Sequence, residues 1–373
     1  MQPMQRPAAP RPWPIVLTID DFARGLSTTI FHPFFALLLP LTLRAQATPL
    51  THPSFVLTAV YAVFVSLCWI LSSANRRVAY GACRKVRLED EVVVITGGAG
   101  GLGRLLAEAW GRRGVSVAVL DIKASEGLDG AKAGVDANSE LDRYAEEESG
   151  MRWYRCDVGD WEEVQVVAQK VAKDLGPPTI LINNAAIVNG KPLLSLSTSE
   201  IDQNFRVNLI SHFHTLRTFL PSMLAQKRGT IVTVSSVLAH LGSASLSDYT
   251  AAKAGLLALH ASLVAELGQH PDGENIKTIL VTPGQLSTDM FAGVRTPSRF
   301  LGPVIEPAAL AGRIIEAVER GYGAVIAEPL YTRWIQWIAV LPVGVQKVVR
   351  GWSGVDDAMR GFRGRGRGEG RMN

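Results

Sequence analysis

The sequence predicts a doubly wound α/β domain that follows a hydrophobic N-terminal membrane segment. Three features indicate this: short apolar runs alternate with amphipathic stretches from residue 91 onward, a glycine-rich turn follows the first run, and a long uncharged stretch precedes them. An uninterrupted apolar run of about four to eight residues is typical of a strand buried on both faces of a parallel sheet. Regular alternation of such strands with helices favours a sheet covered by helices on both faces.

Composition limits the possible classes of protein. The chain has 373 residues, of which 47% are hydrophobic and 19% charged, with a formal net charge of +4. This length suits one large catalytic domain with extensions. The small charge does not indicate a nucleic-acid partner. The three cysteines, Cys68, Cys83 and Cys156, form neither a metal-ligand pair nor a disulfide framework, which favours a reducing compartment for the catalytic part.

The N-terminal region contains two apolar stretches. Residues 1–29 are Pro-rich and are expected to be loosely ordered. Residues 30–43 include Pro33 and Pro40 and are few for a full membrane span, so we expect a kinked or re-entrant segment there. Residues 55–71 carry no charge. With their flanking serines they would form a helix of roughly 28 Å, near the thickness of a hydrocarbon core.

The charges around these stretches predict an orientation for a membrane anchor at residues 30–75. The basic residues that follow the second stretch are Arg76, Arg77, Arg84, Lys85 and Arg87, whereas the loop before it offers only Arg44. The positive-inside rule therefore places everything after Arg76 in the cytoplasm. Two alternatives stay open. Residues 55–71 would be a buried core helix in one, and Ala45-Gln46-Ala47 would be a signal-peptide cleavage site in the other.

The catalytic domain is expected at residues 88–330. In chain order we expect a strand at 92–95, a helix at 102–112, a strand at 116–120, a loop and helix with a flexible insertion at 123–150, a strand at 153–156, a helix at 161–175, a strand at 179–182, a helix at 201–224, a strand at 230–234, a helix at 248–267, a strand at 277–281 and a helix at 308–319. Residues 331–356 are an apolar C-terminal segment, either an interfacial amphipathic helix or a helix packed on the domain or on a partner subunit. Residues 357–373 are expected to be a disordered Arg/Gly tail.

The glycine-rich turn points to a dinucleotide. It reads Thr96-Gly97-Gly98-Ala99-Gly100-Gly101-Leu102-Gly103 and joins the first strand of the domain to its first helix. A pyrophosphate needs close approach of the backbone and free N–H groups at a helix N-terminus, and glycines permit both. Asp121 ends the next strand, where its carboxylate would accept hydrogen bonds from the adenosine ribose and repel a 2′-phosphate, which favours NAD over NADP. The alternative is an ordinary solvated acid.

Three residues form a pattern that indicates proton transfer to or from a substrate. Tyr249 and Lys253 are four positions apart on an expected helix and so share a face. A nearby ammonium lowers the pKa of a phenol, which lets Tyr249 exchange a proton with a substrate oxygen as hydride moves to or from a nicotinamide. Ser236 ends the fifth strand, where open α/β sheets bind ligands, and its hydroxyl would hold that oxygen. His212 and His214, two apart on a helix, do not share a face, so no metal site is expected.

Together these motifs resemble the short-chain dehydrogenase/reductase family over about residues 91–290, which implies a Rossmann-type fold. The matching positions are Thr96, Gly97, Gly101, Gly103, Asp157, Asn183, Asn184, Ala185, Asn208, Ser236, Tyr249, Lys253, Pro283 and Gly284. Ala186 departs from the family, which usually has glycine after Asn-Asn-Ala, and its methyl is expected to tighten the pocket. Residues 290–301, placed by the resemblance alone, are expected to form part of a substrate lid.

The resemblance also implies individual roles. The implied catalytic residues are Asn208, Ser236, Tyr249 and Lys253. The implied cofactor-binding residues are Thr96, Gly97, Gly101, Leu102, Gly103, Asp121, Asp157, Asn183, Ala185, Tyr249, Lys253, Pro283, Gly284 and Thr288. Asp157 would contact adenine, and Asn183 would stabilise the sheet near the cofactor. Asn208 would hold a water in a proton relay that reaches Lys253, which also binds the nicotinamide-ribose hydroxyls. Pro283, Gly284 and Thr288 would line the nicotinamide carboxamide.

The anchor and the domain together are similar to the membrane-anchored retinol and 17β-hydroxysteroid dehydrogenase-like subgroup. This similarity implies a membrane-bound enzyme that acts on a retinoid, a steroid or a long-chain alcohol. The protein would contact the membrane of the endoplasmic reticulum or a lipid droplet through residues 30–72, with a cytosolic catalytic domain and possible homodimers. Two alternatives stay open: an NADPH-dependent ketoreductase of lipid synthesis, and a non-catalytic membrane or lipid-droplet scaffold with the same fold.

Overall fold

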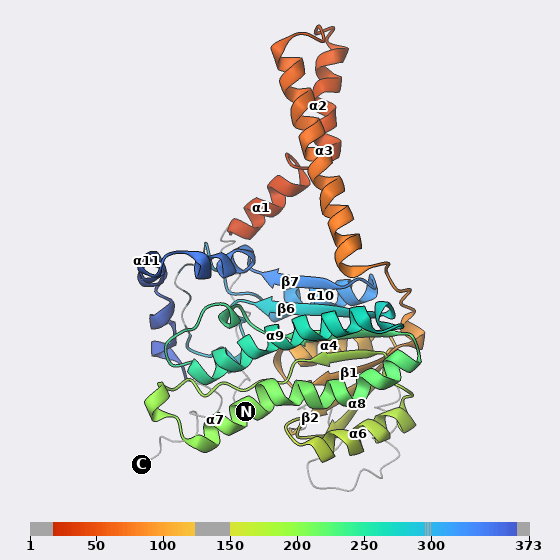
Figure 1. The fold of residues 1–373 in the computed structure, drawn as a ribbon, viewed down its shortest axis with the longest axis vertical. Coiled ribbons are helices and arrows are strands. Elements are labelled where there is room, and N and C mark those ends of the chain that lie inside the picture. The colour runs from red at the N-terminus through yellow and green to blue at the C-terminus, as the bar shows by residue number, and fades with distance from the viewer. Residues whose placement is uncertain (1–17, 124–149, 295, 297, 299, 364–373) are drawn as a thin grey trace, which may run out of the picture.

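The computed structural model describes residues 18–123, 150–294, 296, 298 and 300–363. In this part of the chain, seven parallel strands form one sheet in the order β3-β2-β1-β4-β5-β6-β7, with helices on both faces (Figure 1). The doubly wound α/β fold predicted from the sequence is confirmed.

The elements have the following bounds. The strands are β1 (Val92–Thr96), β2 (Ser116–Asp121), β3 (Met151–Arg155), β4 (Ile180–Asn183), β5 (Gly229–Val234), β6 (Ile276–Pro283) and β7 (Ala324–Glu328). The α-helices are α1 (Ile19–Thr28), α2 (Pro33–Ala45), α3 (Pro53–Tyr80), α4 (Gly101–Gly111), α6 (Trp161–Asp174), α7 (Thr198–Phe205), α8 (Ser211–Ala225), α9 (Ser247–Gln269), α10 (Pro307–Glu319) and α11 (Val343–Ser353).

Two apolar layers hold the helices on the sheet. Side chains alternate across a strand, so Val93 and Ile95 of β1 join the layer under α4 and α10, where Trp110 is fully buried. Val92 and Val94 of the same strand join the opposite layer, under α6, α8 and α9. Every residue of β1 is therefore buried, which explains its uninterrupted apolar sequence.

The strand order positions the site. β1 pairs with both β2 and β4, so the chain builds the sheet outward in one direction as far as β3 and in the other direction from β4 to β7. Open α/β sheets bind ligands at such a reversal, outside the carboxyl ends of the strands.

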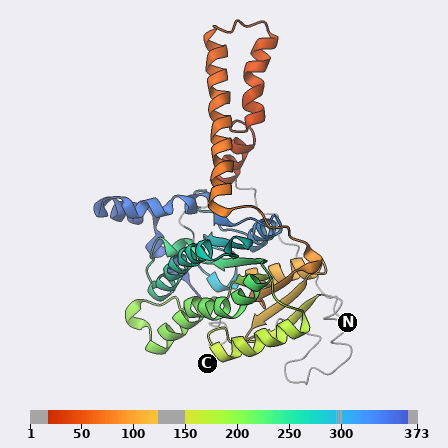
Figure 2. The ribbon, with the colours of Figure 1, turned by 45° about the vertical axis from the view of Figure 1, so that its right-hand side comes forward.

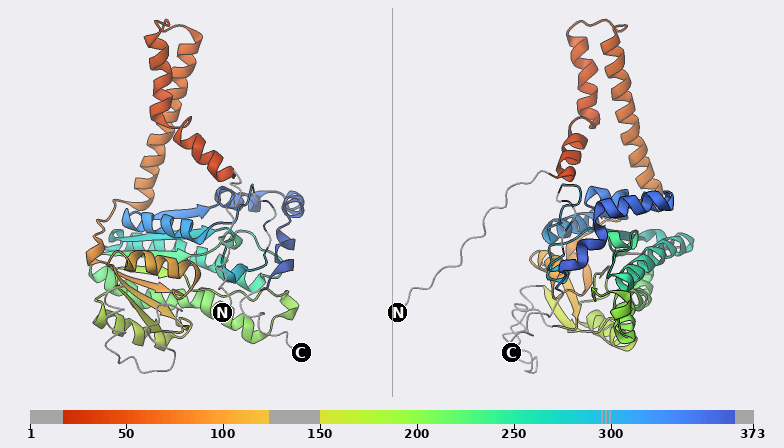
Figure 3. Two further views of the ribbon diagram at one scale, coloured as in Figure 1. Left: turned by 180° about the vertical axis from the view of Figure 1, so that it is seen from behind. Right: turned by 90° about the vertical axis from the view of Figure 1, so that its left-hand side faces the viewer.

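Helices α2 and α3 form a hairpin that projects from the catalytic domain (Figures 1 and 3). Their contact is made by small side chains, since Ala36, Ala62 and Val65 are buried there while most large apolar side chains of the hairpin are exposed. α3 has the length and apolarity to cross a membrane, and α1 with α2 pass the same test as a pair bent by 51°. α9 also passes but packs on the sheet.

The prediction that residues 1–29 are loosely ordered is wrong for residues 19–28, which form α1. A capping box explains the helix: the Asp21 N–H donates to Thr18 Oγ1 at 3.2 Å, and the Thr18 N–H donates to the Asp21 carboxylate at 3.2 Å. Reciprocal capping satisfies amides that a helix start otherwise leaves unpaired. α1 also rests on the catalytic domain, because the Ile19 N–H donates to the Phe300 carbonyl at 3.2 Å.

Other expectations need correction. The helix expected at 201–224 is interrupted by a π-helical segment at Arg206–Ile210, and the seventh strand, β7, was not predicted. The predicted disordered tail at 357–373 is wrong at its start, since Val355–Gly361 form a 3₁₀ segment; residues 364–373 lie outside the described part. The expected insertion falls mostly on residues 124–149, which are also outside it.

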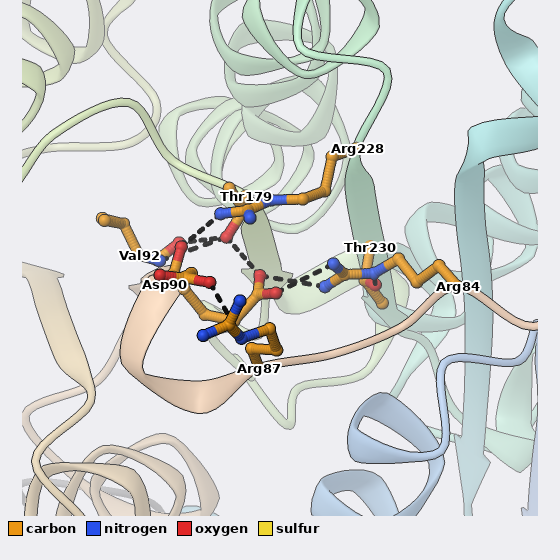
Figure 4. Close-up of polar contacts among 8 residues, drawn as sticks. Arg84, Arg87, Asp90, Val92, Thr179, Arg228 and Thr230 are labelled. Carbon is orange, nitrogen blue, oxygen red and sulfur yellow. Dashed lines mark hydrogen bonds and ion pairs between the residues drawn. The ribbon is translucent and has the colours of Figure 1, made fainter.

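A buried ion pair joins the segment after α3 to the amino ends of the strands (Figure 4). The Arg84 guanidinium donates to both carboxylate oxygens of Glu91 at 3.0 Å, and their side chains are only 7% and 0% exposed. Arg84 Nε also donates to Thr230 Oγ1 at 2.8 Å, and Thr179 Oγ1 donates to Glu91 at 2.5 Å. Because every charged group has polar partners, the pair fastens the entry of the chain into β1 to β4 and β5.

Candidate active site

A cavity of about 610 Å³ opens at the carboxyl edge of the sheet, beside the reversal of strand order. Its lining includes most of the residues predicted for the site: Gly97, Gly101, Leu102, Asp121, Asp157, Ala185, Ser236, Tyr249, Lys253, Pro283, Gly284 and Thr288. The other predicted residues, Thr96, Gly103, Asn183 and Asn208, lie behind this lining, and three of them are buried side chains of the surrounding framework.

The glycine-rich turn has no room for side chains. Gly97 has a φ of +63°, and a Cβ there would lie 2.7 Å from the Cα of Ala185. A Cβ at Gly103 would lie 2.5 Å from the Gly97 carbonyl oxygen. Among the described residues no side chain caps the start of α4 at Gly100, and Gly100, Gly101 and Leu102 face the cavity. The first amides of α4 are thus available to an anion.

The Asn-Asn-Ala motif after β4 holds this turn in place. Asn184 Nδ2 donates to the carbonyls of Thr96 at 3.1 Å and Gly97 at 3.0 Å, while Thr96 Oγ1 accepts from the N–H groups of Asn184 and Ala185. The sequence reasoning gave Asn184 no role of its own. Its position beside two residues with assigned roles was the available signal.

Asp121 ends β2 at the rim of the cavity. One of its carboxylate oxygens accepts from the Ala99 N–H and the other from the Lys123 N–H, each at 3.0 Å. These bonds fix the carboxylate between the glycine-rich turn and the strand end. Asp157, which also lines the cavity, accepts from the Gly159 N–H at 2.9 Å and so shapes the turn after β3.

Tyr249 and Lys253 share the inner face of α9, and both are buried. Burial raises the pKa of Tyr249 to about 12, although a hydrogen bond with Ser236 opposes that rise, and burial lowers the pKa of Lys253 to about 7. Lys253 Nζ donates to the Val234 carbonyl at 2.9 Å and lies 5.7 Å from the Tyr249 ring centroid. At this separation desolvation outweighs the predicted lowering of the phenol pKa by the ammonium.

Asn208 and Asn183 support the site from behind. Asn208 lies in the π-helical segment, where its side chain accepts from the Ile187 N–H and donates to the Ile187 carbonyl, both at 2.9 Å. It therefore fixes the strip of chain that borders the cavity after β4. Asn183 is buried in β4 and accepts from Thr215 Oγ1 of α8 at 2.8 Å, which ties the sheet to that helix.

Comparison with known proteins identifies the family. The family model described as short chain dehydrogenase matches residues 91–298. The chain belongs to the short-chain dehydrogenase/reductase family. The mouse epidermal retinol dehydrogenase 2 is 34% identical over 280 residues, which cover 74% of this chain and 85% of that protein. An uncharacterized oxidoreductase of Saccharomyces cerevisiae is 30% identical over 271 residues, which cover 72% and 83% respectively.

As a short-chain dehydrogenase/reductase, the protein is an oxidoreductase that acts on CH–OH groups with NAD or NADP. Among solved structures, a metagenomic short-chain oxidoreductase in complex with NADP is 26% identical, with a TM-score of 0.49 and coverage of 64% of this chain and 96% of that one. The dinucleotide that the family uses fits the residues described above. The closely packed glycine-rich turn, the uncapped α4 and the rim carboxylate suit a pyrophosphate and a ribose.

In this short-chain dehydrogenase/reductase an apolar cluster packs around Tyr249, and two of its members, Tyr249 and Phe291, line the cavity. Tyr249 belongs to a cluster with Leu246 and Met359, both buried. The remaining apolar residues packed on this cluster are Val188, Leu238, Phe291, Val294 and Phe362. The rings of Phe291 and Tyr249 meet edge to face with centroids 6.3 Å apart. Met359 and Phe362 come from the C-terminal segment, and no sequence pattern linked that segment to the site.

The described residues contain no group of three or more His, Cys, Asp or Glu side chains placed to hold a metal ion. His212 is buried, and burial holds its pKa well below the ordinary value. His214 instead packs on Trp161, with ring centroids 5.6 Å apart. The two histidine side chains thus lie in different environments.

Proposed function

We propose that this protein is a membrane-bound NAD-dependent dehydrogenase that interconverts a lipophilic alcohol and its carbonyl product. The observation that carries the proposal is the apolar cluster around Tyr249. The phenol of Tyr249 lines the cavity beside Met290 and Phe291, where one substrate oxygen would meet the hydroxyl and a hydrocarbon skeleton would meet apolar side chains.

In this proposal the residues divide the work of one proton transfer. The nicotinamide, when bound, supplies or accepts the hydride at the substrate carbon. Tyr249 gives a proton to the substrate oxygen during reduction and takes it back during oxidation, and Ser236 donates a hydrogen bond that holds this oxygen. Lys253, when protonated, donates to the ribose hydroxyls and stabilises negative charge on the phenol. Asn208 keeps the neighbouring backbone positioned for the water of the proton relay.

The preference for NAD is inferred from Asp121. Its carboxylate is held at the cavity rim by the Ala99 and Lys123 amides, where the adenosine ribose of a bound dinucleotide would lie. A carboxylate accepts from both ribose hydroxyls and repels a 2′-phosphate. Lys123 follows two positions later and is exposed. Because this cation lies so close to Asp121, the activities with NAD and with NADP are compared in the full-length protein.

Retinoids are the first substrates to test. Relatives named epidermal retinol dehydrogenase 2 include the mouse protein above and a human protein that is 32% identical over 83% of this chain and 97% of its own length. That alignment extends into the hydrophobic N-terminal region, because the 83% of this chain that it covers is more than residues 88–373 provide. The hairpin of α2 and α3 would hold the cavity near a bilayer, where retinoids, steroids and long-chain alcohols partition.

The test is a substrate and cofactor screen with detergent-solubilised full-length protein. Retinol, a hydroxysteroid, a long-chain alcohol and a short water-soluble alcohol would each be offered with NAD and with NADP, and dinucleotide reduction would be followed. We expect turnover with NAD on at least one substrate and none with Tyr249→Phe under the same conditions. Equal or better turnover with NADP would contradict the cofactor assignment. Turnover confined to short water-soluble alcohols would contradict the substrate class.

A further inference from the structure

The C-terminal segment presents an exposed apolar surface at the foot of the hairpin. It consists of two 3₁₀ segments, Leu330–Arg333 and Ile335–Val340, followed by helix α11. Its outward-facing apolar residues, each at least 44% exposed, are Trp334, Trp337, Val340, Val343, Val345, Val348 and Trp352. Apolar surface this contiguous, with three tryptophans, marks an interaction site.

Helix α11 is turned with its apolar stripe outward. Val345, Val348 and Trp352 recur at helical spacing, so they lie on one face of the helix, and Trp352 is 78% exposed. The polar side chains on the other side of the helix bond within the same segment: Gln346 Nε2 donates to the Leu341 carbonyl at 2.7 Å, and Arg350 pairs with Asp356 at 2.6 Å. A helix packed for water alone would have the opposite orientation.

The position of this surface identifies its partner. The segment begins at Leu330, whose N–H donates to Asp20 of α1 at 2.7 Å, so it starts where the first arm of the hairpin meets the domain. The other arm meets the domain at the opposite edge of the sheet, where the carbonyl of Tyr80 accepts from Lys277 Nζ at the amino end of β6 at 3.2 Å. Figures 2 and 3 show α11 on the side of the domain from which the hairpin rises, lying roughly across the direction of the hairpin.

From these observations we propose that α11 and the preceding tryptophan-bearing turns form a second membrane contact, which lies in the surface of the same bilayer that the hairpin enters. Tryptophan is enriched at the boundary between lipid tails and headgroups, and amphipathic helices bind there with the apolar face down. The contact is independent of the reaction catalysed.

The segment is fixed in this position by the domain. After α11 the chain folds back through Val355–Gly361. The Ser243 hydroxyl donates to the Val355 carbonyl at 3.0 Å, and Met359 is buried in the cluster around Tyr249. Helix α11 and the residues that pack on the cluster around Tyr249 are therefore consecutive in the chain, and the contact would hold the cavity near the bilayer surface.

The test compares neighbouring positions on α11 in the full-length protein. The exposed cysteines Cys68 and Cys83 are replaced by serine, while Cys156 is kept because it is buried with a pKa raised to about 12. A single cysteine is then introduced as Val348→Cys on the apolar stripe or as Lys347→Cys on the polar side. Each variant is labelled with a polarity-sensitive fluorophore and reconstituted into phosphatidylcholine and phosphatidylserine vesicles.

We expect the label at position 348 to shift to the blue, to lose most of its emission to nitroxide-bearing lipids and to resist aqueous iodide. The label at position 347 should show the reverse. Equal iodide quenching at both positions would overturn the proposal. Shielding of position 348 from both quenchers, lost when each vesicle holds one chain, would also overturn it and would identify a second copy as the partner.

A third label, at Phe64→Cys on the exposed face of α3, checks the hairpin itself. Quenching of this label by the nitroxide lipids, together with the pattern expected at positions 347 and 348, supports the second contact. If the label on α3 escapes the lipid quencher, the anchor fails and the proposal fails with it. If only position 348 escapes, the contact by α11 fails alone.

Discussion

At the scale of single residues, burial sets the chemistry of the site. Tyr249 and Lys253 lie together beneath an apolar cluster, and desolvation moves their pKa values in opposite directions, to about 12 and about 7. Both shifts favour the neutral form of each group. The phenol therefore stays protonated and can act as a proton donor. The pKa of the lysine lies near neutral pH, so its charge changes readily there.

This burial predicts a difference between the two directions of the reaction. Because the pKa of Tyr249 is raised, its phenol stays protonated at neutral pH, so carbonyl reduction should keep its rate from about pH 6 to about pH 9. Alcohol oxidation needs the phenolate, whose population grows with pH, so its rate should rise across that range. The measurement is kcat/KM in both directions. An oxidation rate that falls with rising pH would contradict this assignment.

Asp121→Ala tests the cofactor preference. The change removes a charge-assisted hydrogen bond to the ribose, which is worth about 1.5–3 kcal/mol, so kcat/KM with NAD should fall by roughly ten-fold to a hundred-fold. The advantage over NADP should narrow, because the repulsion of a 2′-phosphate disappears too. Asp121→Asn is the control that keeps the shape and removes the charge. A ratio of NAD to NADP activity that is unchanged in both variants would refute the role of Asp121.

At the scale of elements, sequence reasoning succeeded where a pattern had one physical cause. The strands β1, β2, β4, β5 and β6 were predictable because each is buried on both faces and has a run of apolar residues at its centre. β7 was missed because it is an edge strand of mixed exposure, and Val325, its second residue, is 56% exposed. α1 was missed because its capping box is short and follows a Pro-rich stretch.

Some residues of the site could be predicted from local sequence motifs, and others could not. Gly97, Tyr249 and Lys253 could be predicted because they lie in short motifs, and the spacing of residues within each motif fixes their relative positions. Met359 joins Tyr249 from the distant C-terminal segment, a contact that depends on the path of the chain and not on any local pattern. The pKa of Tyr249 was also mispredicted in direction, since a spacing of four residues does not reveal how deeply the pair is buried.

The entry of the chain into β1 provides a prediction about stability. Arg84→Ala leaves Glu91 buried without its partner, which should lower the free energy of unfolding by about 3–5 kcal/mol. Arg87→Ala is the matched control, because Arg87 pairs with Glu89 at the surface, where both side chains are more than 60% exposed. Loss of such a pair should change stability by about 0–1 kcal/mol. Denaturant unfolding that gives equal losses for the two variants would contradict this account.

At the scale of the whole molecule, the two ends of the hairpin predict a topology. α1 contacts Phe300 and Leu330, and the end of α3 contacts Lys277, so both arms return to the catalytic domain. The hairpin should therefore enter and leave the bilayer from one side, with the domain in the cytoplasm because basic residues follow α3. In sealed microsomes, protease should remove tags from both termini. A protected C-terminal tag would reverse the orientation, and a protected N-terminal tag alone would indicate a single crossing.

The central claim is that Tyr249 transfers the proton of an NAD-dependent alcohol oxidation, and one comparison tests it most directly. Wild-type protein and Tyr249→Phe are reconstituted with the lipophilic substrate that the screen selects, and single-turnover NADH formation is measured beside NAD binding. Phenylalanine keeps the ring packing against Leu246 and Met359, so folding and NAD affinity should be unchanged while the rate falls by about 10²–10⁴-fold. A variant that binds NAD normally and oxidises the alcohol at the wild-type rate would contradict the account.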